Sequence, residues 1–121
     1  MTTILIVDDE AAIVELLQLV LEDAGYRVLT ALSGHDAWAV MATQRPDAIL
    51  TDFMMPGMTG VELAQAVHDD AALAGIPLVM MSAVRLPQPR NGLWSAELPK
   101  PWRMEHVLSM VAALTGGPKL P

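Results

Sequence analysis

Acidic side chains follow two apolar segments of this chain, at the point where each segment ends. Residues 3–7 (TILIV) run directly into Asp8 and Asp9, and residues 48–51 (AILT) run into Asp52. Apolar runs of this length are typical of strands buried in a parallel sheet, whose carboxyl ends share one edge. Three carboxylates gathered at that edge repel one another unless a cation lies among them. This arrangement suggests a divalent metal and phosphate chemistry.

Two further polar residues end apolar segments nearer the C-terminus. Ser82 follows residues 78–81 (LVMM), and Lys100 follows a short apolar stretch near residues 96–98. Open parallel sheets bind their ligands outside the carboxyl ends of the strands. We therefore expect Ser82 and Lys100 to reach the same edge as the three acids.

Helical patterns alternate with these strands. Apolar residues recur at helical spacing over 13–21, 37–41, 61–67 and 104–114. Gly25 is expected to end the first of these helices, residues 26–30 to form a second strand, and Ser33 to cap the next helix. Pro87 and Pro89 interrupt any helix over 84–92. The pattern predicts an α/β fold, a doubly wound five-stranded parallel sheet with helices on both faces and a fourth helix that is short or irregular.

Composition narrows the class of protein. The chain has 121 residues, which predicts one domain, expected over 1–115, with 116–121 as a C-terminal tail or the start of a linker. Seven basic residues against 14 acidic ones give a net charge of −7, which disfavours direct nucleic-acid binding. There is no cysteine, no basic start of a signal peptide and no apolar run near the ~20 residues of a membrane helix. We expect a cytoplasmic protein that does not insert into membranes.

Five sequence features together resemble one protein family. They are the acid pair Asp8-Asp9, the strand-end Asp52, the loop 55–60 (MPGMTG), Ser82-Ala83, and Lys100-Pro101. Their order and spacing are similar to those of the receiver domain of bacterial two-component response regulators, the CheY-like superfamily, over about the whole chain. Receivers of this kind are a standard example of the flavodoxin-like strand order 2-1-3-4-5, and this order is taken over from them.

The resemblance implies a function and a set of site residues. Asp52 would accept a phosphoryl group from a histidine kinase or a histidine phosphotransfer protein, in a Mg²⁺-dependent reaction. Asp9, Asp52 and the backbone carbonyl of Met54 would bind the metal directly, and Asp8 mostly through water. Lys100 would contact a phosphoryl oxygen, and the Ser82 hydroxyl would turn toward the phosphate. The Lys100-Pro101 peptide bond would be cis. Such a chain is a phospho-accepting regulator rather than an enzyme with turnover, and we expect a monomer or a weak homodimer.

Two departures from the family pattern bear on how the site signals. The family usually has Tyr or Phe three residues before the lysine, where this chain has Glu97. The segment between Ser82 and Lys100 is a few residues short, and its prolines replace the fourth helix. We therefore predict an atypical output face, with an irregular, mobile segment over 84–92 and no aromatic switch. The residues two positions after Asp52 and Ser82, Met54 and Val84, are apolar and predict slow self-dephosphorylation.

Other interpretations of the same residues stay open. Taken singly, Asp8 could cap a helix, Asp52 could be a turn acid, Ser82 a strand-end cap and Lys100 a surface lysine. A metal-dependent phosphatase acting on small molecules is one alternative, although such enzymes usually carry a second Asp where this chain has Met54. The other is a phosphorylation-independent interaction module with a receiver fold. The sequence does not decide whether Trp38, Trp94 and Trp102 are packing or interface residues.

Overall fold

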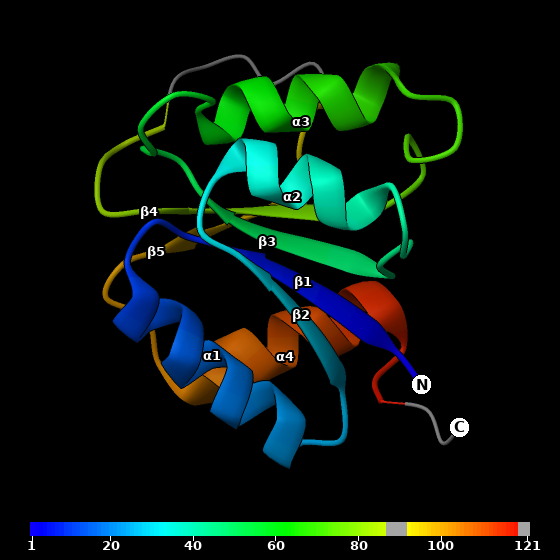
Figure 1. Cartoon of the computed structure of the whole chain (residues 1–121). Coiled ribbons are helices and arrows are strands. Elements are labelled where there is room, and N and C mark those ends of the chain that lie inside the picture. Colours follow the sequence, from blue (N-terminus) through cyan, green and yellow to red (C-terminus); the bar gives the residue numbers. More distant parts are fainter. Residues whose placement is uncertain (87–91, 119–121) are drawn as a thin grey trace.

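Five parallel strands form one sheet that lies between two pairs of helices (Figure 1). The structure is a computed structural model, and it describes residues 1–86 and 92–118. The strand order is β2-β1-β3-β4-β5, and every neighbouring pair is parallel. Helices α2 and α3 cover one face of the sheet, and α1 and α4 cover the other. The doubly wound fold and the 2-1-3-4-5 order are therefore confirmed.

The elements follow the alternation of strand and helix that the sequence predicts. In chain order they are β1 (Thr3–Val7), α1 (Ala11–Asp23), β2 (Arg27–Ala31), α2 (Gly34–Met41), β3 (Ala48–Asp52), α3 (Gly60–Asp69), β4 (Leu78–Ser82), β5 (Ala96–Pro99) and α4 (Met104–Thr115).

Alternate residues of the central strands belong to two separate hydrophobic clusters. Leu5, Ile49 and Met80 pack under α2 and α3, whereas Ile4 and Leu50 pack under α1 and α4. Side chains of a strand point to opposite faces in turn, so a sheet covered on both faces needs apolar residues at every position. All five residues of β1, β3 and β4 are buried accordingly. This rigid centre fixes the strand ends that carry the polar residues.

Local details differ from the sequence prediction at the second strand. The strand begins at Arg27 and not at Tyr26, because the Tyr26 backbone N–H bonds back to the carbonyl of Leu21 and closes the end of α1. Gly25 supplies the left-handed conformation of this turn, with φ +101°. The Tyr26 side chain is buried in the cluster under α1 and α4.

No helix lies between β4 and β5 in the parts of this segment that the structure describes, residues 83–86 and 92–95. This agrees with the expected loss of the fourth helix for residues 84–86 and 92. Residues 87–91, which include Pro87 and Pro89, lie outside the described part of the chain. The prediction that this segment is mobile stays a prediction.

Within residues 1–86 and 92–118, none of the helices has both the length and the apolar character that crossing a membrane requires.

Candidate functional site

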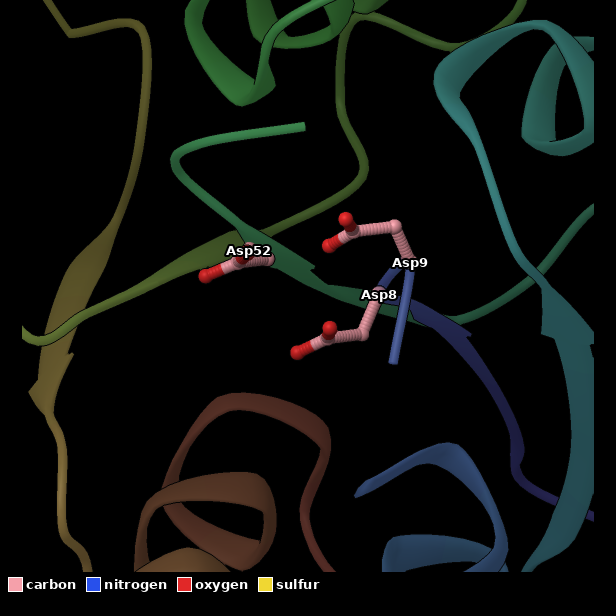
Figure 2. A group of neighbouring side chains, drawn as sticks. All are labelled: Asp8, Asp9 and Asp52. Atoms are coloured by element: carbon pink, nitrogen blue, oxygen red, sulfur yellow. The ribbon is translucent and has the colours of Figure 1, made fainter. Parts of the chain in front are cut away.

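Three carboxylates meet at the carboxyl edge of the sheet (Figure 2). Asp8 and Asp9 follow β1, Asp52 is the last residue of β3, and the two strands are neighbours. One carboxylate oxygen from each residue lies within 4.8 Å of the others. Asp8 is fully buried and Asp52 is 8% exposed, whereas Asp9 is exposed. The structure thus brings together the three acids that the sequence singled out.

Lys100 lies between two of these acids. Its Nζ donates to Asp8 Oδ2 at 3.0 Å and to Asp52 Oδ1 at 3.1 Å. Asp8 Oδ1 accepts the backbone N–H of Glu10 at 2.9 Å, so both oxygens of this buried carboxylate have a partner. Asp8 does not cap α1, whose N-cap residue is Glu10. The Lys100-Pro101 peptide bond is cis, as the family resemblance implies.

Burial, hydrogen bonds and neighbouring charges together shift the pKa values of Asp52 and Lys100. Burial raises the pKa of Asp52, the Lys100 hydrogen bond lowers it, and the charges of Asp8 and Asp9 raise it again, so the pKa lies above its ordinary value of 3.8. Burial by itself would lower the pKa of Lys100, but its hydrogen bonds to Asp8 and Asp52 outweigh burial and raise it. The raised pKa of Asp52 is thus due first to burial, and the raised pKa of Lys100 to the two carboxylates that it contacts.

The donor set fits a magnesium ion. Three hard oxygen donors converge at the strand ends, and one ammonium group leaves two of the three negative charges without compensation. Mg²⁺ binds through one or two carboxylates and keeps several waters. Within residues 1–86 and 92–118, Lys100 forms hydrogen bonds with Asp8 and Asp52 but not with Asp9. Because the Asp9 side chain is exposed, a solvated cation can reach it.

The loop after β3 is held tightly against the site. Gly60 donates its backbone N–H to the carbonyl of Phe53 at 3.0 Å, and a Cβ at Gly60 would lie 2.3 Å from the carbonyl oxygen of Asp52. Thr59 caps α3 with Glu62 in a reciprocal capping box. Gly57 has a φ of +76°, which favours glycine. The MPGMTG motif therefore fixes the backbone beside Asp52.

Ser82 is turned toward its own loop. Its hydroxyl donates to the carbonyl of Val84 at 2.8 Å and accepts the Val84 N–H at 3.0 Å. Ser82 is nonetheless one of the walls of the depression at the strand ends, which has a volume of about 340 Å³. Its lining residues are Asp9, Glu10, Asp52, Met54, Ser82, Ala83, Val84 and Lys100. All the predicted site residues except the buried Asp8 line this depression.

Two exposed apolar residues are among those that line the depression. Met54 is 62% exposed and Val84 is 56% exposed, and both line it. Sequence reasoning identified these two positions from their spacing to Asp52 and Ser82. It gave no site role to Glu10, or to Ala83 beyond its place in the Ser82-Ala83 pair, and the only signal for either is that it directly follows a predicted site residue.

Glu97 has a defined role that the sequence did not indicate. It lies on the exposed side of β5, and its Oε2 accepts the indole N–H of Trp94 at 2.9 Å. Trp94 is 8% exposed and packs in the cluster under α2 and α3. No spacing rule links a tryptophan to a glutamate three residues later in an irregular segment, so only the structure reveals this pair.

The sequence of this chain is similar to those of known response regulators. The model of the response regulator receiver domain family matches residues 4–112. The phosphate regulon regulator PhoB of Pseudomonas aeruginosa is 47% identical over 81 residues, which are 67% of this chain and 35% of PhoB. The transcriptional regulator RpaA of Synechocystis is 36% identical over 118 residues, or 94% of this chain and 49% of RpaA. The chain thus spans about a third to a half of the length of these relatives.

Solved structures share the fold. The chemotaxis protein CheY4 of Vibrio cholerae superposes with a TM-score of 0.88 at 31% identity, covering 94% of this chain and 98% of CheY4. The response regulator TrrA of Thermotoga maritima, in complex with Mg²⁺ and BeF, superposes with a TM-score of 0.85 at 26% identity. The superposition covers 94% of this chain and 99% of TrrA.

Proposed function

This chain belongs to the response regulator receiver domain family, and from this premise we propose that Asp52 accepts a phosphoryl group from a phosphohistidine of a partner protein. The observation that carries the proposal is the position of Asp52. It lies in an open depression with Lys100 at 3.1 Å and two further carboxylates beside it.

The proposed reaction moves one phosphoryl group between two side chains. An Asp52 carboxylate oxygen attacks phosphorus, the new P–O bond forms as the P–N bond to the donor imidazole breaks, and the imidazole leaves with its electron pair and takes up a proton. A carboxylate can act as such a nucleophile. Phosphoryl transfer requires mainly positioning and the compensation of charge. Within residues 1–86 and 92–118, Asp52 Oδ1 accepts a hydrogen bond from Lys100 and Oδ2 accepts none, so Oδ2 is the oxygen that is freer to attack.

The other site residues support this transfer in different ways. Asp8, Asp9, Asp52 and the Met54 carbonyl would hold Mg²⁺, which when bound offsets negative charge on the phosphoryl oxygens. Lys100 would leave Asp52 Oδ1 for a phosphoryl oxygen while it keeps its bond to Asp8, so the ammonium group needs only a small movement. Ser82 lines the same depression, and its hydroxyl would donate to another phosphoryl oxygen.

Partners follow from the chemistry of the donor. We expect a histidine kinase or a histidine phosphotransfer protein as the source of the phosphoryl group, and a protein as the downstream target. The relatives named above are transcriptional regulators about twice as long as this chain, so a DNA-linked output would need sequence beyond the region they share with it. The negative net charge of −7 supports the absence of direct DNA contact by the receiver itself. The atypical output face, centred on Glu97, is part of this proposal, as are the cytoplasmic location and the monomeric or weakly dimeric state.

Chemical phosphorylation tests the acceptor directly. Incubation with acetyl phosphate and Mg²⁺ should add one phosphoryl group to the chain, seen as a mass increase that base removes. Asp52→Asn should abolish the adduct. Asp69→Asn, at an exposed acid on α3, is the matched control and should label like the wild type.

Three outcomes separate the candidate functions. An adduct that persists in Asp52→Asn rules out Asp52 as the sole acceptor. Steady turnover of a generic phosphate ester would identify a small-molecule phosphatase. A protein partner that binds wild type and Asp52→Asn equally, with no adduct in either, would identify a phosphorylation-independent module.

A further inference from the structure

One methionine is exposed beside the proposed acceptor. The chain has nine methionines and no cysteine, so methionine is its only sulfur-containing residue. Met54 is 62% exposed, and the N-terminal Met1 is the other exposed methionine within residues 1–86 and 92–118, which contain all nine. The other seven are partly or fully buried. Because an oxidant must reach the sulfur atom, Met54 is the internal methionine most open to oxidation.

The backbone on both sides of Met54 is fixed. The Phe53 N–H donates to the Met81 carbonyl at 2.9 Å, and the Phe53 carbonyl accepts the Gly60 N–H at 3.0 Å. The next residue, Met55, is 6% exposed and packs in the cluster under α2 and α3. Residue 54 is therefore held in the lining of the depression at the strand ends, with its side chain in solvent.

Oxidation would change what this side chain can bond. With hydrogen peroxide, the sulfur lone pair attacks one peroxide oxygen, and the S–O bond forms as the O–O bond breaks. The hydroxide that leaves takes up the proton of the transferred oxygen and becomes water, so sulfur is oxidised by two electrons and the peroxide is reduced. The product, methionine sulfoxide, is polar, and its oxygen accepts hydrogen bonds that a thioether accepts only weakly.

A new acceptor at residue 54 would lie where hydrolysis takes place. An acyl phosphate on Asp52 is lost when a water molecule is held close to phosphorus. The side chains of Met54 and Val84, which line the depression, hold such a water weakly or not at all in the reduced protein. A sulfoxide oxygen would accept one O–H of this water and restrict its position beside the acyl phosphate. The change at sulfur would thus reach the phosphorylated state through one water molecule.

We propose that Met54 is a site of reversible oxidation by hydrogen peroxide, and that its sulfoxide shortens the life of the phosphoryl group on Asp52. The reduced side chain keeps the phosphorylated state long-lived, and the oxidised side chain returns the protein sooner to its unmodified form. Enzymatic reduction of the sulfoxide restores the long-lived state. The oxidation itself needs only the exposed sulfur, whereas its effect on lifetime rests on the proposed acceptor function.

Peptide mapping by mass spectrometry tests the modification. After treatment with hydrogen peroxide, Met54 should gain one oxygen atom about tenfold faster than Met55, its buried neighbour in the chain. Fragment ions distinguish the two adjacent residues, so each digest contains its own control. Equal rates of oxidation at the two residues overturn the modification site.

The decay of the label tests the effect on lifetime. Oxidised protein, freed of peroxide, is labelled with acetyl phosphate and Mg²⁺, and the loss of the phosphoryl mass is timed after acetyl phosphate is removed. We expect decay several-fold faster than in the reduced protein. Methionine sulfoxide reductases for both sulfoxide epimers should restore the slow decay. Met54→Leu, whose side chain has no sulfur, should decay at the same rate with and without peroxide treatment.

The possible results separate the modification from its effect. A sulfoxide at Met54 with unchanged decay, or an oxidised protein that no longer accepts label, overturns the effect on lifetime. Equal acceleration by peroxide in Met54→Leu assigns the effect to another residue and also overturns it. Absence of label in reduced protein overturns the acceptor function, and the effect on lifetime with it, while the peptide map still decides whether Met54 is oxidised.

Discussion

Asp52, the proposed phosphoryl acceptor, lies in an environment that disfavours its ionised form. Burial and the neighbouring carboxylates raise its pKa, although Lys100 partly counters them. A carboxyl group whose pKa is higher in the folded than in the unfolded state binds its proton more tightly when folded. Its ionisation therefore lowers the free energy of unfolding as the pH rises from the ordinary value of 3.8 through the folded-state pKa. Above the folded-state pKa, the ionised Asp52 therefore destabilises the metal-free protein.

Removing that charge should stabilise the metal-free protein. In EDTA at pH 7, Asp52→Asn is expected to melt a few degrees above the wild type, because the amide keeps an acceptor for Lys100 without the buried charge. The difference in melting temperature should narrow as the pH falls through the folded-state pKa toward 3.8, because wild-type Asp52 then becomes protonated. Thermal unfolding followed by circular dichroism between pH 7 and the ordinary value of 3.8 measures the melting temperatures of both proteins. A less stable Asp52→Asn across all pH values would show that the Lys100 bond, not burial, dominates.

Asp9 is expected to carry most of the response to magnesium. Millimolar Mg²⁺ should raise the melting temperature of the wild type, since a cation that binds only the folded state stabilises it by mass action. Asp9→Ala should remove most of that rise while changing metal-free stability by less than about 0.5 kcal/mol, because the side chain is exposed. Glu15→Ala, at another exposed acid, should respond like the wild type. Equal Mg²⁺ responses in wild type and Asp9→Ala would argue against the metal site.

Met54 is expected to prolong the phosphorylated state. Hydrolysis of the acyl phosphate needs an aligned water, and the exposed thioether and the Val84 side chain offer it only weak or no hydrogen bonds. Met54→Asn introduces an amide at the rim of the depression and should speed the decay of the label several-fold. Met54→Leu should decay like the wild type. Mass spectrometry after removal of acetyl phosphate measures the decay of the phosphorylated form of each variant. Rapid decay of the wild type, with the same rate in Met54→Asn, would contradict the role of Met54 in prolonging the phosphorylated state.

At the scale of elements, strand ends place the charges and tight loops hold them. β1 and β3 are buried along their whole length, so Asp52 at the end of β3 and Asp8 directly after β1 are attached to backbone that packs in both hydrophobic clusters. The β3–α3 connection is equally constrained, since Gly60 approaches the backbone of Asp52 and the Met80 sulfur closely.

Gly60 should therefore tolerate no side chain. A Cβ there would lie 2.3 Å from the Asp52 carbonyl oxygen and 2.8 Å from Met80 Sδ, so the loop must shift. We expect Gly60→Ala to lower the free energy of unfolding by about 3 kcal/mol and to reduce labelling of Asp52. Gly75→Ala is the matched control, because its nearest contact would be Arg45 Nη2 at 4.0 Å. Chemical denaturation and the phosphorylation assay measure both effects, and equal stability of the two variants would refute the close-packing argument.

At the scale of the whole molecule, the chain beyond α4 returns to the start of the sheet. The Thr2 hydroxyl donates to the Gly117 carbonyl at 3.0 Å, and both residues are buried. Pro118 lies beside Gly25, where an added Cβ would be 3.2 Å from it. Residues 117 and 118 thus contact the domain, while the assignment of 116–121 to a C-terminal tail or the start of a linker stays a prediction.

Truncation after Thr115 tests whether these contacts matter. We expect a loss of about 1 kcal/mol of unfolding free energy, the usual value of one buried hydrogen bond, with labelling of Asp52 unchanged. Thr2→Val removes the same hydrogen bond while keeping the side-chain shape, so it should reproduce most of the loss. If the truncated chain is as stable as the full one, residues 116–118 are dispensable and the boundary at 115 is supported.

The sequence could indicate which polar residues gather at this edge because Asp8, Asp52, Ser82 and Lys100 each end a strand or directly follow one. Apolar runs that stop at Asp8, Asp52 and Ser82 identify buried parallel strands, and parallel strands deliver their C-terminal residues to one edge by geometry alone. The strand order was taken from the family resemblance, since the order of neighbours depends on contacts between distant segments. Helix boundaries were predicted to within a few residues because Ser33 and Gly25 act through local backbone bonds.

The tertiary structure alone decided which polar groups bond to one another. Lys100 joins Asp8 and Asp52 across 92 and 48 residues, Ser82 bonds its own loop, and Trp94 bonds Glu97. Such pairings depend on side-chain rotamers and on the packing of separate elements, and no spacing in the chain encodes either. The sequence therefore determined which chemical groups reach the edge of the sheet, and the folded structure determined the hydrogen bonds that hold each of them there.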